Sequence, residues 1–285
     1  MLARTLTLIT LLSGCLSAVD VVPGCEKALL LPAPPERVAA SARESVNGWD
    51  AGSEVQIIAH RGFACCFPEN TLLAIQGAFD MGADGVEIDV RFTRDGVPML
   101  MHDETLDRTT NGSGLLSDYR YRQIRELDAC SWFGREFPKC KVPTLQEALE
   151  VGKGRGKILL DLKRNGPCRI QKVLAAIQNL DMQGQVSIIS AGVEVLRTVR
   201  SYDREIPVGF VVYDDPEMDR IVRMGNSAVF FTLNTMRANP SYVSTARRKG
   251  AAVGGWTAQS HEEARGLLEF KVDWLLSDLP ISVSN

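Results

Sequence analysis

Eight short apolar runs recur along the chain from residue 54 onward, and amphipathic segments separate them. Such alternation is typical of βαβ units around a parallel sheet, because each crossover helix lays an apolar face against the strands. Eight strands with helices between them predict a (β/α)8 TIM barrel, for which 285 residues are sufficient. The predicted strands span residues 55–60, 85–91, 158–162, 186–190, 207–212, 228–232, 251–256 and 273–277.

Capping patterns mark where several of the intervening helices begin. Thr144 stands three residues before Glu147, and Ser260 stands three residues before Glu263, which is the spacing of a capping box. Another helix is predicted over residues 70–81, with Asn70 and Thr71 as its caps.

A ninth apolar run, residues 97–101, does not fit the barrel count. Only a short turn containing Asp95-Gly96 separates it from the second strand, whereas a parallel crossover needs a dozen or more residues. We therefore expect residues 92–101 to form the return arm of a hairpin. This arm opens an inserted cap of about residues 92–143 after the second strand, and loops of this length are usually functional.

Two carboxylates lie within the apolar second strand. Glu87 and Asp89 are spaced i, i+2, so in a strand both side chains point to the same face. Adjacent carboxylates repel one another unless a cation or a shared proton compensates them. A hard divalent ion with oxygen ligands is the natural partner for such a pair.

Further charged residues stand where other apolar runs end. His60 and Arg61 close the first strand, His102 ends the hairpin arm, and Asp161 and Lys163 close the third strand. Reactive residues of barrels of this type gather at the carboxyl ends of the strands. These residues are therefore expected to meet at one end of the barrel.

In their order along the chain, these residues resemble the glycerophosphodiester phosphodiesterase family. The resemblance covers roughly residues 55 to 280, nearly the whole predicted barrel. It rests on His60-Arg61-Gly62, Pro68-Glu69-Asn70-Thr71, Glu87-x-Asp89, His102-Asp103, Arg108-Thr109-Thr110-Asn111-Gly112, Pro143-Thr144-Leu145-Gln146-Glu147-Ala148-Leu149, Gly255-Trp256-Thr257 and Val272-Asp273-Trp274-Leu275-Leu276-Ser277-Asp278-Leu279-Pro280.

The resemblance implies a role for each of these charged groups. Glu87, Asp89 and Asp161 would ligate one divalent cation, Mg²⁺ or Ca²⁺, although the family more often has Glu where this chain has Asp161. His60 and His102 would be the acid/base pair. Arg61 and Lys163 would offset charge on the substrate phosphate, Arg61 as a planar fork and Lys163 as a point charge.

The implied reaction is metal-dependent hydrolysis of glycerophosphodiesters to sn-glycerol 3-phosphate and an alcohol. The Asp161-x-Lys163 pattern also resembles secreted phospholipase D and sphingomyelinase D enzymes, so an enzyme acting on lysophospholipid or sphingomyelin is the alternative. A binding protein that keeps the barrel without turnover is a third reading. Both histidines and the acidic pair are present, which disfavours it.

Three residues near these motifs admit two interpretations each. Trp256 either lines the substrate pocket or packs in the barrel. Glu69 is either part of the site or a first-turn acid of the following helix. Asp103 either orients His102 or begins the loop, and His261, beside the capping Ser260, is expected to be an exposed helix residue.

The first residues have the features of a secretory signal. Arg4 precedes an apolar run, Leu6 to Leu12, that is far shorter than the ~20 residues of a membrane span. Leu12-Ser13-Gly14-Cys15 resembles a bacterial lipobox, which would place a lipid on Cys15; ordinary cleavage near Ala18 is the alternative. We expect residues 1–18 to be the signal, residues 19–53 a tether and residues 54–285 the barrel, in a protein that is exported and membrane-anchored or secreted.

Export permits disulfides among the six cysteines besides Cys15. Cys130 and Cys140 flank one loop segment and are candidates to bridge. With 32 basic and 35 acidic residues and no concentrated basic stretch, nucleic acid is not an expected partner. A small glycerophosphodiester is the expected partner, membrane attachment would occur through Cys15, and no protein partner is predicted.

Overall fold

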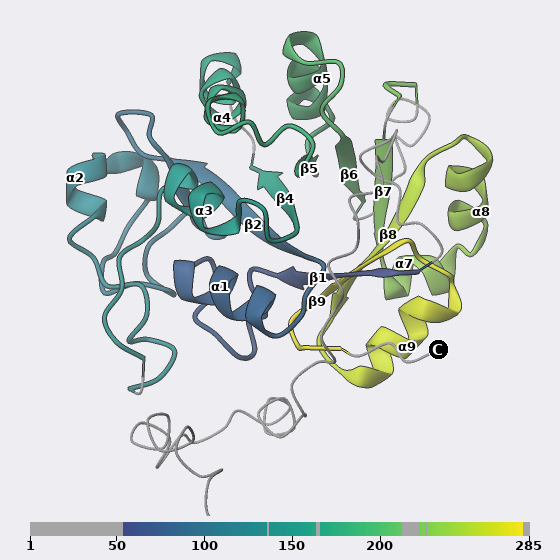
Figure 1. Cartoon of the computed structure of the whole chain (residues 1–285), viewed down its shortest axis with the longest axis horizontal. Helices are drawn as coiled ribbons and strands as arrows, with labels where there is room; N and C mark the ends of the chain where they lie inside the picture. Colours follow the sequence, from purple (N-terminus) through teal and green to yellow (C-terminus); the bar gives the residue numbers. More distant parts are fainter. Residues whose placement is uncertain (1–53, 136, 164–165, 213–222, 226, 282–285) are drawn as a thin grey trace, which may run out of the picture.

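The computed structural model describes residues 54–281, apart from 136, 164–165, 213–222 and 226. Within these residues, eight parallel strands close into a barrel with helices around it, which confirms the predicted (β/α)8 fold (Figure 1). Each predicted barrel strand lies within two residues of an observed one. The barrel strands are β1 (Gln56–His60), β2 (Gly85–Phe92), β4 (Lys157–Leu162), β5 (Val186–Ser190), β6 (Val208–Val212), β7 (Ser227–Thr232), β8 (Ala252–Ala258) and β9 (Trp274–Ser277).

Strand β1 closes the barrel because it pairs with both β2 and β9. His60 is opposite Glu87 on β2, while Ala59 is opposite Ser277 at the end of β9. The register continues to β4, where Asp161 is opposite Asp89. The first strand therefore meets the last strand, and the carboxyl ends of the strands share one rim.

Several helices of the barrel begin at a capping side chain. Thr144 and Glu147 form a full capping box at α3. At α9 the Ser260 side chain accepts the Glu263 N–H as predicted, but the Glu263 carboxylate accepts the N–H of Gln259 rather than that of Ser260. The barrel helices are α1 (Leu72–Asp80), α3 (Leu145–Gly152), α4 (Pro167–Asn179), α5 (Val193–Tyr202), α7 (Leu233–Ala238), α8 (Ser241–Arg248) and α9 (His261–Glu269).

Two apolar layers follow from the alternation of side chains along the strands. The outward residues form one large cluster with the helices. The inward residues form a separate cluster that fills the barrel, which we call the floor: Ile58, Leu159, Ile189, Val211, Ala228, Phe230, Trp274 and Leu276. Gly254 fits here because a Cβ at that position would lie 2.1 Å from the Phe230 ring.

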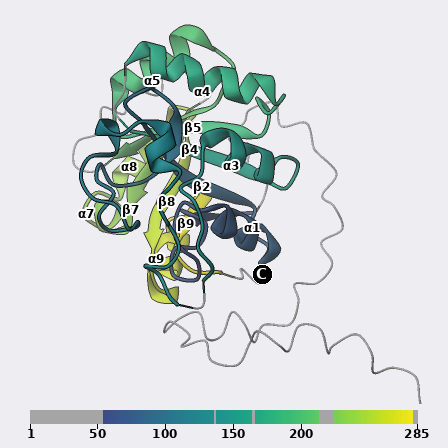
Figure 2. The same cartoon turned by 90° about the vertical axis from the view of Figure 1, so that its left-hand side faces the viewer.

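The insertion after the second strand folds on its own small core. Strand β3 (Pro98–Leu100) pairs antiparallel with β2, so the predicted hairpin arm is confirmed. Beyond it lie the 3-10 turn η1 (Leu116–Asp118) and the short helix α2 (Tyr121–Ile124). Helix α2 lies on the side of the molecule that is at the left in Figure 1 and faces the viewer in Figure 2. Their core contains Met99, Met101, Leu106, Leu116, Ile124, Ala129 and Val142. The disulfide between Cys130 and Cys140 is present, as expected.

The predicted signal, the lipobox at Cys15 and the tether all lie outside the described residues. Within the part of the chain that is described, none of the helices has the length and apolar character to cross a bilayer.

Candidate active site at the mouth of the barrel

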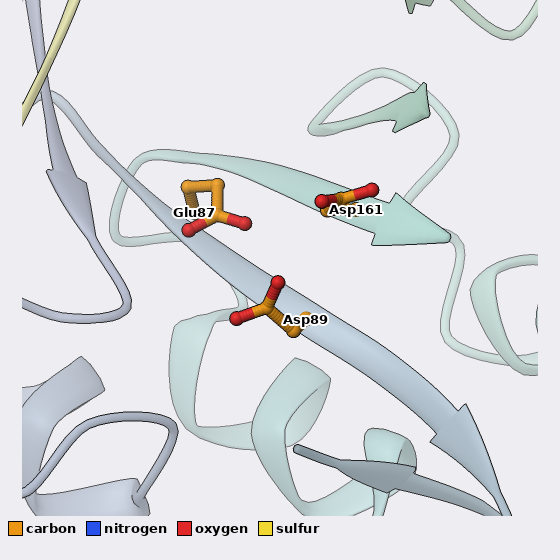
Figure 3. Close-up of side chains that lie close together, drawn as sticks. All are labelled: Glu87, Asp89 and Asp161. Atoms are coloured by element: carbon orange, nitrogen blue, oxygen red, sulfur yellow. The ribbon is translucent and has the colours of Figure 1, made fainter. Parts of the chain in front are cut away.

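Three carboxylates from two neighbouring strands meet at the rim of the barrel. Glu87 and Asp89 extend from β2 and Asp161 extends from β4, and one oxygen of each lies within 4.8 Å of the others (Figure 3). Glu87 and Asp89 are buried, whereas Asp161 is half-buried. The donor set is all oxygen, which is the set that Mg²⁺ and Ca²⁺ take. The structure thus brings together the three predicted ligands, and this group could hold a divalent cation.

The proximity of these groups affects their protonation. Burial, and then the negative charge of Asp89, raise the pKa of Glu87 to about 8. Burial likewise raises the pKa of Asp161 above its usual value. For Asp89 burial acts in the same direction, but the charges of Lys163 and Arg61 outweigh it and hold its pKa well below the usual range. Three carboxylates in this arrangement need positive charge, and two side chains supply part of it.

Lys163 supplies positive charge from the end of β4. Its Nζ lies 2.5 Å from Asp161 Oδ2 and 2.6 Å from Asp89 Oδ1. The i, i+2 spacing of Asp161 and Lys163 turns both side chains into the mouth, as the sequence predicted. The surrounding carboxylates outweigh burial and raise the pKa of Lys163, so the ammonium remains charged.

The loop between β1 and α1 supplies the second cation. Arg61 donates its backbone N–H to Glu87 Oε2 at 3.1 Å, and its Nε lies 3.4 Å from Asp89 Oδ2. The backbone is left-handed at Arg61 (φ 52°) and Gly62 (φ 84°). A Cβ at Gly62 would lie 2.6 Å from the Ala74 side chain, so only glycine permits this close approach of the loop to α1.

Asn70 has a different role from the predicted helix cap. The cap of α1 is Thr71, which accepts the Ala74 N–H. Asn70 is left-handed (φ 57°), and its side chain donates to Asp89 Oδ2 at 2.8 Å and accepts the Asp89 backbone N–H at 2.9 Å. This amide therefore fixes the orientation of one of the three carboxylates.

His60 is held between two acids. Its Nδ1 lies 2.6 Å from Asp278 Oδ1, and its Nε2 lies 3.9 Å from Glu87 Oε2. Burial alone would lower the pKa of His60, but the hydrogen bond to Asp278 and the negative charge of Glu87 outweigh it, so the pKa is raised. An aspartate that accepts from Nδ1 leaves Nε2 for proton exchange.

His102 reaches the mouth from the insertion. Its Nδ1 lies 2.7 Å from Asp103 Oδ1, so Asp103 does orient the ring. Burial, together with the positive charges of Arg61 and Lys163, lowers the pKa of His102. Glu69 and Asn70 of the β1–α1 loop line one small cavity together with His102, so the insertion lies against that loop.

Glu69 contacts Arg61 at the mouth and does not lie in the first turn of a helix. It precedes α1, and its Oε1 accepts from Arg61 Nη1 at 3.0 Å. Trp256, on β8, packs against the floor and stays half-buried at the mouth end of the strand. His261 is exposed on α9, as expected.

Asp278 is a further residue that the sequence analysis did not assign to the site. It lies 218 positions from His60, so no local pattern links the two. One signal was available: a carboxylate that directly follows the last strand of a closed barrel must lie beside the end of the first strand.

Comparison with known proteins places the chain among relatives of the same kind. The sequence matches the model of the glycerophosphoryl diester phosphodiesterase family over residues 60–282. A glycerophosphodiester phosphodiesterase of Caldanaerobacter subterraneus is 31% identical over 236 residues, covering 80% of this chain and 96% of the relative. Glycerophosphodiester phosphodiesterase 1 of Homo sapiens is 32% identical over 246 residues, covering 73% of each chain.

A solved structure agrees with this match. A phosphodiesterase of Oleispira antarctica, in complex with the product sn-glycerol-3-phosphate, superposes with a TM-score of 0.71 at 30% identity. The match covers 79% of this chain and 93% of that chain.

Proposed function

The chain belongs to the glycerophosphoryl diester phosphodiesterase family, a family of phosphoric diester hydrolases, and from this premise we propose that it hydrolyses glycerophosphodiesters to sn-glycerol 3-phosphate and an alcohol. The observation that carries the proposal is the meeting of two histidines and three carboxylates at one barrel mouth. The product found in the Oleispira antarctica relative is the product proposed here.

Glu87, Asp89 and Asp161 are proposed to hold one divalent cation, Mg²⁺ or Ca²⁺. The fit rests on their oxygen donors, their mutual distances and the excess negative charge between them. When bound, the ion would supply positive charge to the phosphoryl oxygens. Arg61 and Lys163 would add to that charge at the phosphate, and the half-buried Trp256 would contact the substrate at the opposite side of the mouth.

His60 and His102 are proposed to exchange the protons of the reaction. One takes the proton of the attacking water or substrate hydroxyl, and the other gives a proton to the leaving alcohol. Asp278 engages Nδ1 of His60, and Asp103 engages Nδ1 of His102. Each histidine therefore has its Nε2 available for proton exchange. Such acid/base exchange contributes about 10²–10⁴-fold to rate.

Product analysis tests the proposal directly. The full chain would be incubated with glycerophosphocholine, glycerophosphoethanolamine or lysophosphatidylcholine in Mg²⁺, Ca²⁺ or EDTA. We expect metal-dependent release of sn-glycerol 3-phosphate that is lost in His60→Ala. Turnover of the lysolipid alone would replace the proposal with the phospholipase D-like reading. A folded protein that turns over none of the three would favour the binding-protein reading.

We also propose that the protein is exported, with residues 1–18 as the signal and residues 19–53 as a tether. Lipid attachment at Cys15 is the proposed anchor, supported by the sequence Leu12-Ser13-Gly14-Cys15. Detergent phase partitioning of the protein expressed in a bacterial host tests this. The native chain should enter the detergent phase and Cys15→Ser should not; equal partitioning would contradict the anchor.

A further inference from the structure

Arg108 connects the insertion to the barrel through two carboxylates. It stands in a turn of the insertion, and its guanidinium binds Glu69 with Nη1 to Oε2 at 2.6 Å and Nη2 to Oε1 at 2.8 Å. The same guanidinium binds Asp103 with Nε to Oδ2 at 2.6 Å and Nη2 to Oδ1 at 3.1 Å. All three nitrogens are engaged, and only the planar fork of arginine can satisfy two carboxylates in this way.

Each of these carboxylates has a second partner at the mouth. Asp103 holds Nδ1 of His102 at 2.7 Å. Glu69 holds Nη1 of Arg61 at 3.0 Å. Arg108 is therefore linked through Asp103 to His102, a proposed acid/base residue, and through Glu69 to Arg61, a proposed phosphate-binding residue. None of the hydrogen bonds or ion pairs described joins Arg108 to the three proposed metal ligands.

The exposure of the pair suggests what Arg108 does. The Glu69 side chain is only 8% exposed, so its charge must be paired, whereas 43% of the Arg108 side chain remains exposed. A side chain this exposed adds little to the apolar core. Its hydrogen bonds instead fix the directions of two carboxylates on which functional groups depend.

We propose that Arg108 is a positioning residue that orients His102 through Asp103 and Arg61 through Glu69, and so ties the insertion to the catalytic geometry. The inference deepens the proposed function and rests on it for its kinetic consequences. Loss of a partner that orients a functional side chain typically costs about 10–100-fold in activity.

The insertion offers a matched control in a second arginine clamp. Arg125, which follows α2, binds Glu147 of α3 with Nη1 to Oε2 at 3.0 Å and Nη2 to Oε1 at 2.8 Å. It also donates to the backbone oxygen of Val142. This clamp likewise joins the insertion to the barrel, but its carboxylate caps a helix and holds no histidine.

Kinetics of Arg108→Met, Arg108→Lys and Arg125→Met separate positioning from support. We expect Arg108→Met to lower kcat by about 10–100-fold with a smaller change in KM, and Arg108→Lys to recover part of the loss. Arg125→Met should keep kcat within about threefold of the native value. Its Tm should fall by about as much as the Tm of Arg108→Met, because each variant loses one clamp between the insertion and the barrel. Equal kcat losses in Arg108→Met and Arg125→Met would overturn the proposal.

A double-mutant cycle tests the route through Asp103. If Arg108 acts through that carboxylate, Asp103→Asn combined with Arg108→Met should lose little more than the more damaging single change. Losses that multiply would show that the two residues act independently, which contradicts the proposed route.

The tautomer of His102 supplies a readout that needs no turnover. The chain has three histidines, so imidazole ¹⁵N signals can be assigned with His60→Ala and His261→Ala. We expect His102 to carry its proton on Nδ1 in the native chain and in Arg125→Met, and to populate both tautomers in Arg108→Met. An unchanged tautomer in Arg108→Met overturns the positioning role even if the proposed function holds. A changed tautomer in a protein without phosphodiesterase activity would support the positioning role and reject the function.

Discussion

The floor and the mouth of the barrel are both lined by β1 and β4, and a floor residue and a mouth residue stand only two positions apart on each of these strands. On β4, Leu159 points into the floor and Asp161 points into the mouth. On β1, Ile58 belongs to the floor and His60 to the mouth. Side chains at i and i+2 point to the same face of a strand, so both members of each pair point into the barrel. Moving two residues along the strand changes the surroundings of the side chain from apolar to charged.

This contrast separates stability from chemistry along one strand. Floor side chains stabilise the fold by removing apolar surface from water. Mouth carboxylates do the opposite, because burial and mutual repulsion raise the free energy of the charged forms. Substitutions in the floor should therefore lower stability and leave activity intact, whereas substitutions in the mouth should lower activity and leave stability intact or raise it. Four experiments can test this contrast.

The largest effect is expected at the mouth histidines. His102→Ala should lower kcat/KM by about 10²–10⁴-fold, because an acid/base group is lost. Its Tm should change little, since the ring is one-third exposed. His261→Ala is the matched control, because His261 is exposed on α9. Its kcat/KM, measured by steady-state kinetics, should stay at the native value. Comparable losses in both would remove the distinction between mouth and surface.

A floor substitution should act on stability alone. Leu159→Ala is expected to lower the free energy of unfolding by about 2–5 kcal/mol through the cavity it leaves. Denaturant unfolding measures this, and activity below the new transition should stay near native. Asp161→Asn, two residues further along β4, is the paired variant and should reverse the pattern: activity falls while the unfolding midpoint holds.

The partner of His60 should have an intermediate effect. Asp278→Asn keeps the size of the side chain but removes the negative charge that holds Nδ1. We expect kcat to fall by about 10–100-fold, comparable to the loss of orienting partners at metal sites. If the hydrogen bond serves only to close the barrel, kcat would be unchanged and only Tm would fall.

The smallest effect is a gain in stability at the mouth. Glu87→Gln keeps an acceptor for the Arg61 N–H and, in experiments above pH 8 where Glu87 is ionised, removes one of three neighbouring charges. In EDTA its Tm should exceed that of the native chain by about 2–4 °C for each kcal/mol of relieved repulsion. Calorimetry would contradict the proposed repulsion if the variant were less stable than the native chain without metal.

Local patterns were sufficient to predict the barrel and most of its mouth. The strands, the hairpin arm before His102 and the Thr144 capping box all depend on residues close in sequence, where periodicity and spacing carry the information. Asp161 and Lys163 were likewise predictable, because strand geometry turns both to one face. The Cys130–Cys140 bridge was a candidate because the two cysteines flank one loop segment, and the structure confirms it.

What the sequence did not reveal depends on contacts between distant segments. Asn70 follows the pattern of a cap, yet a left-handed backbone turns its amide onto Asp89, 19 positions away. Glu69 pairs with Arg108 across 39 positions, and only the docking of the insertion decides that contact. Such partners are set by tertiary structure and not by propensity.

The pairing of the first strand with the last also bears on synthesis of the protein. A nascent chain that has reached α9 already carries both mouth histidines and all three carboxylates. It still lacks β9, which closes the sheet against β1, and Asp278, which holds His60. A contact across 218 positions can form only when the final strand has emerged from the ribosome. Emergence of β9 and Asp278 is thus the step that brings the partner of His60 to the mouth, so a product truncated before β9 would contain the reactive groups without their working arrangement.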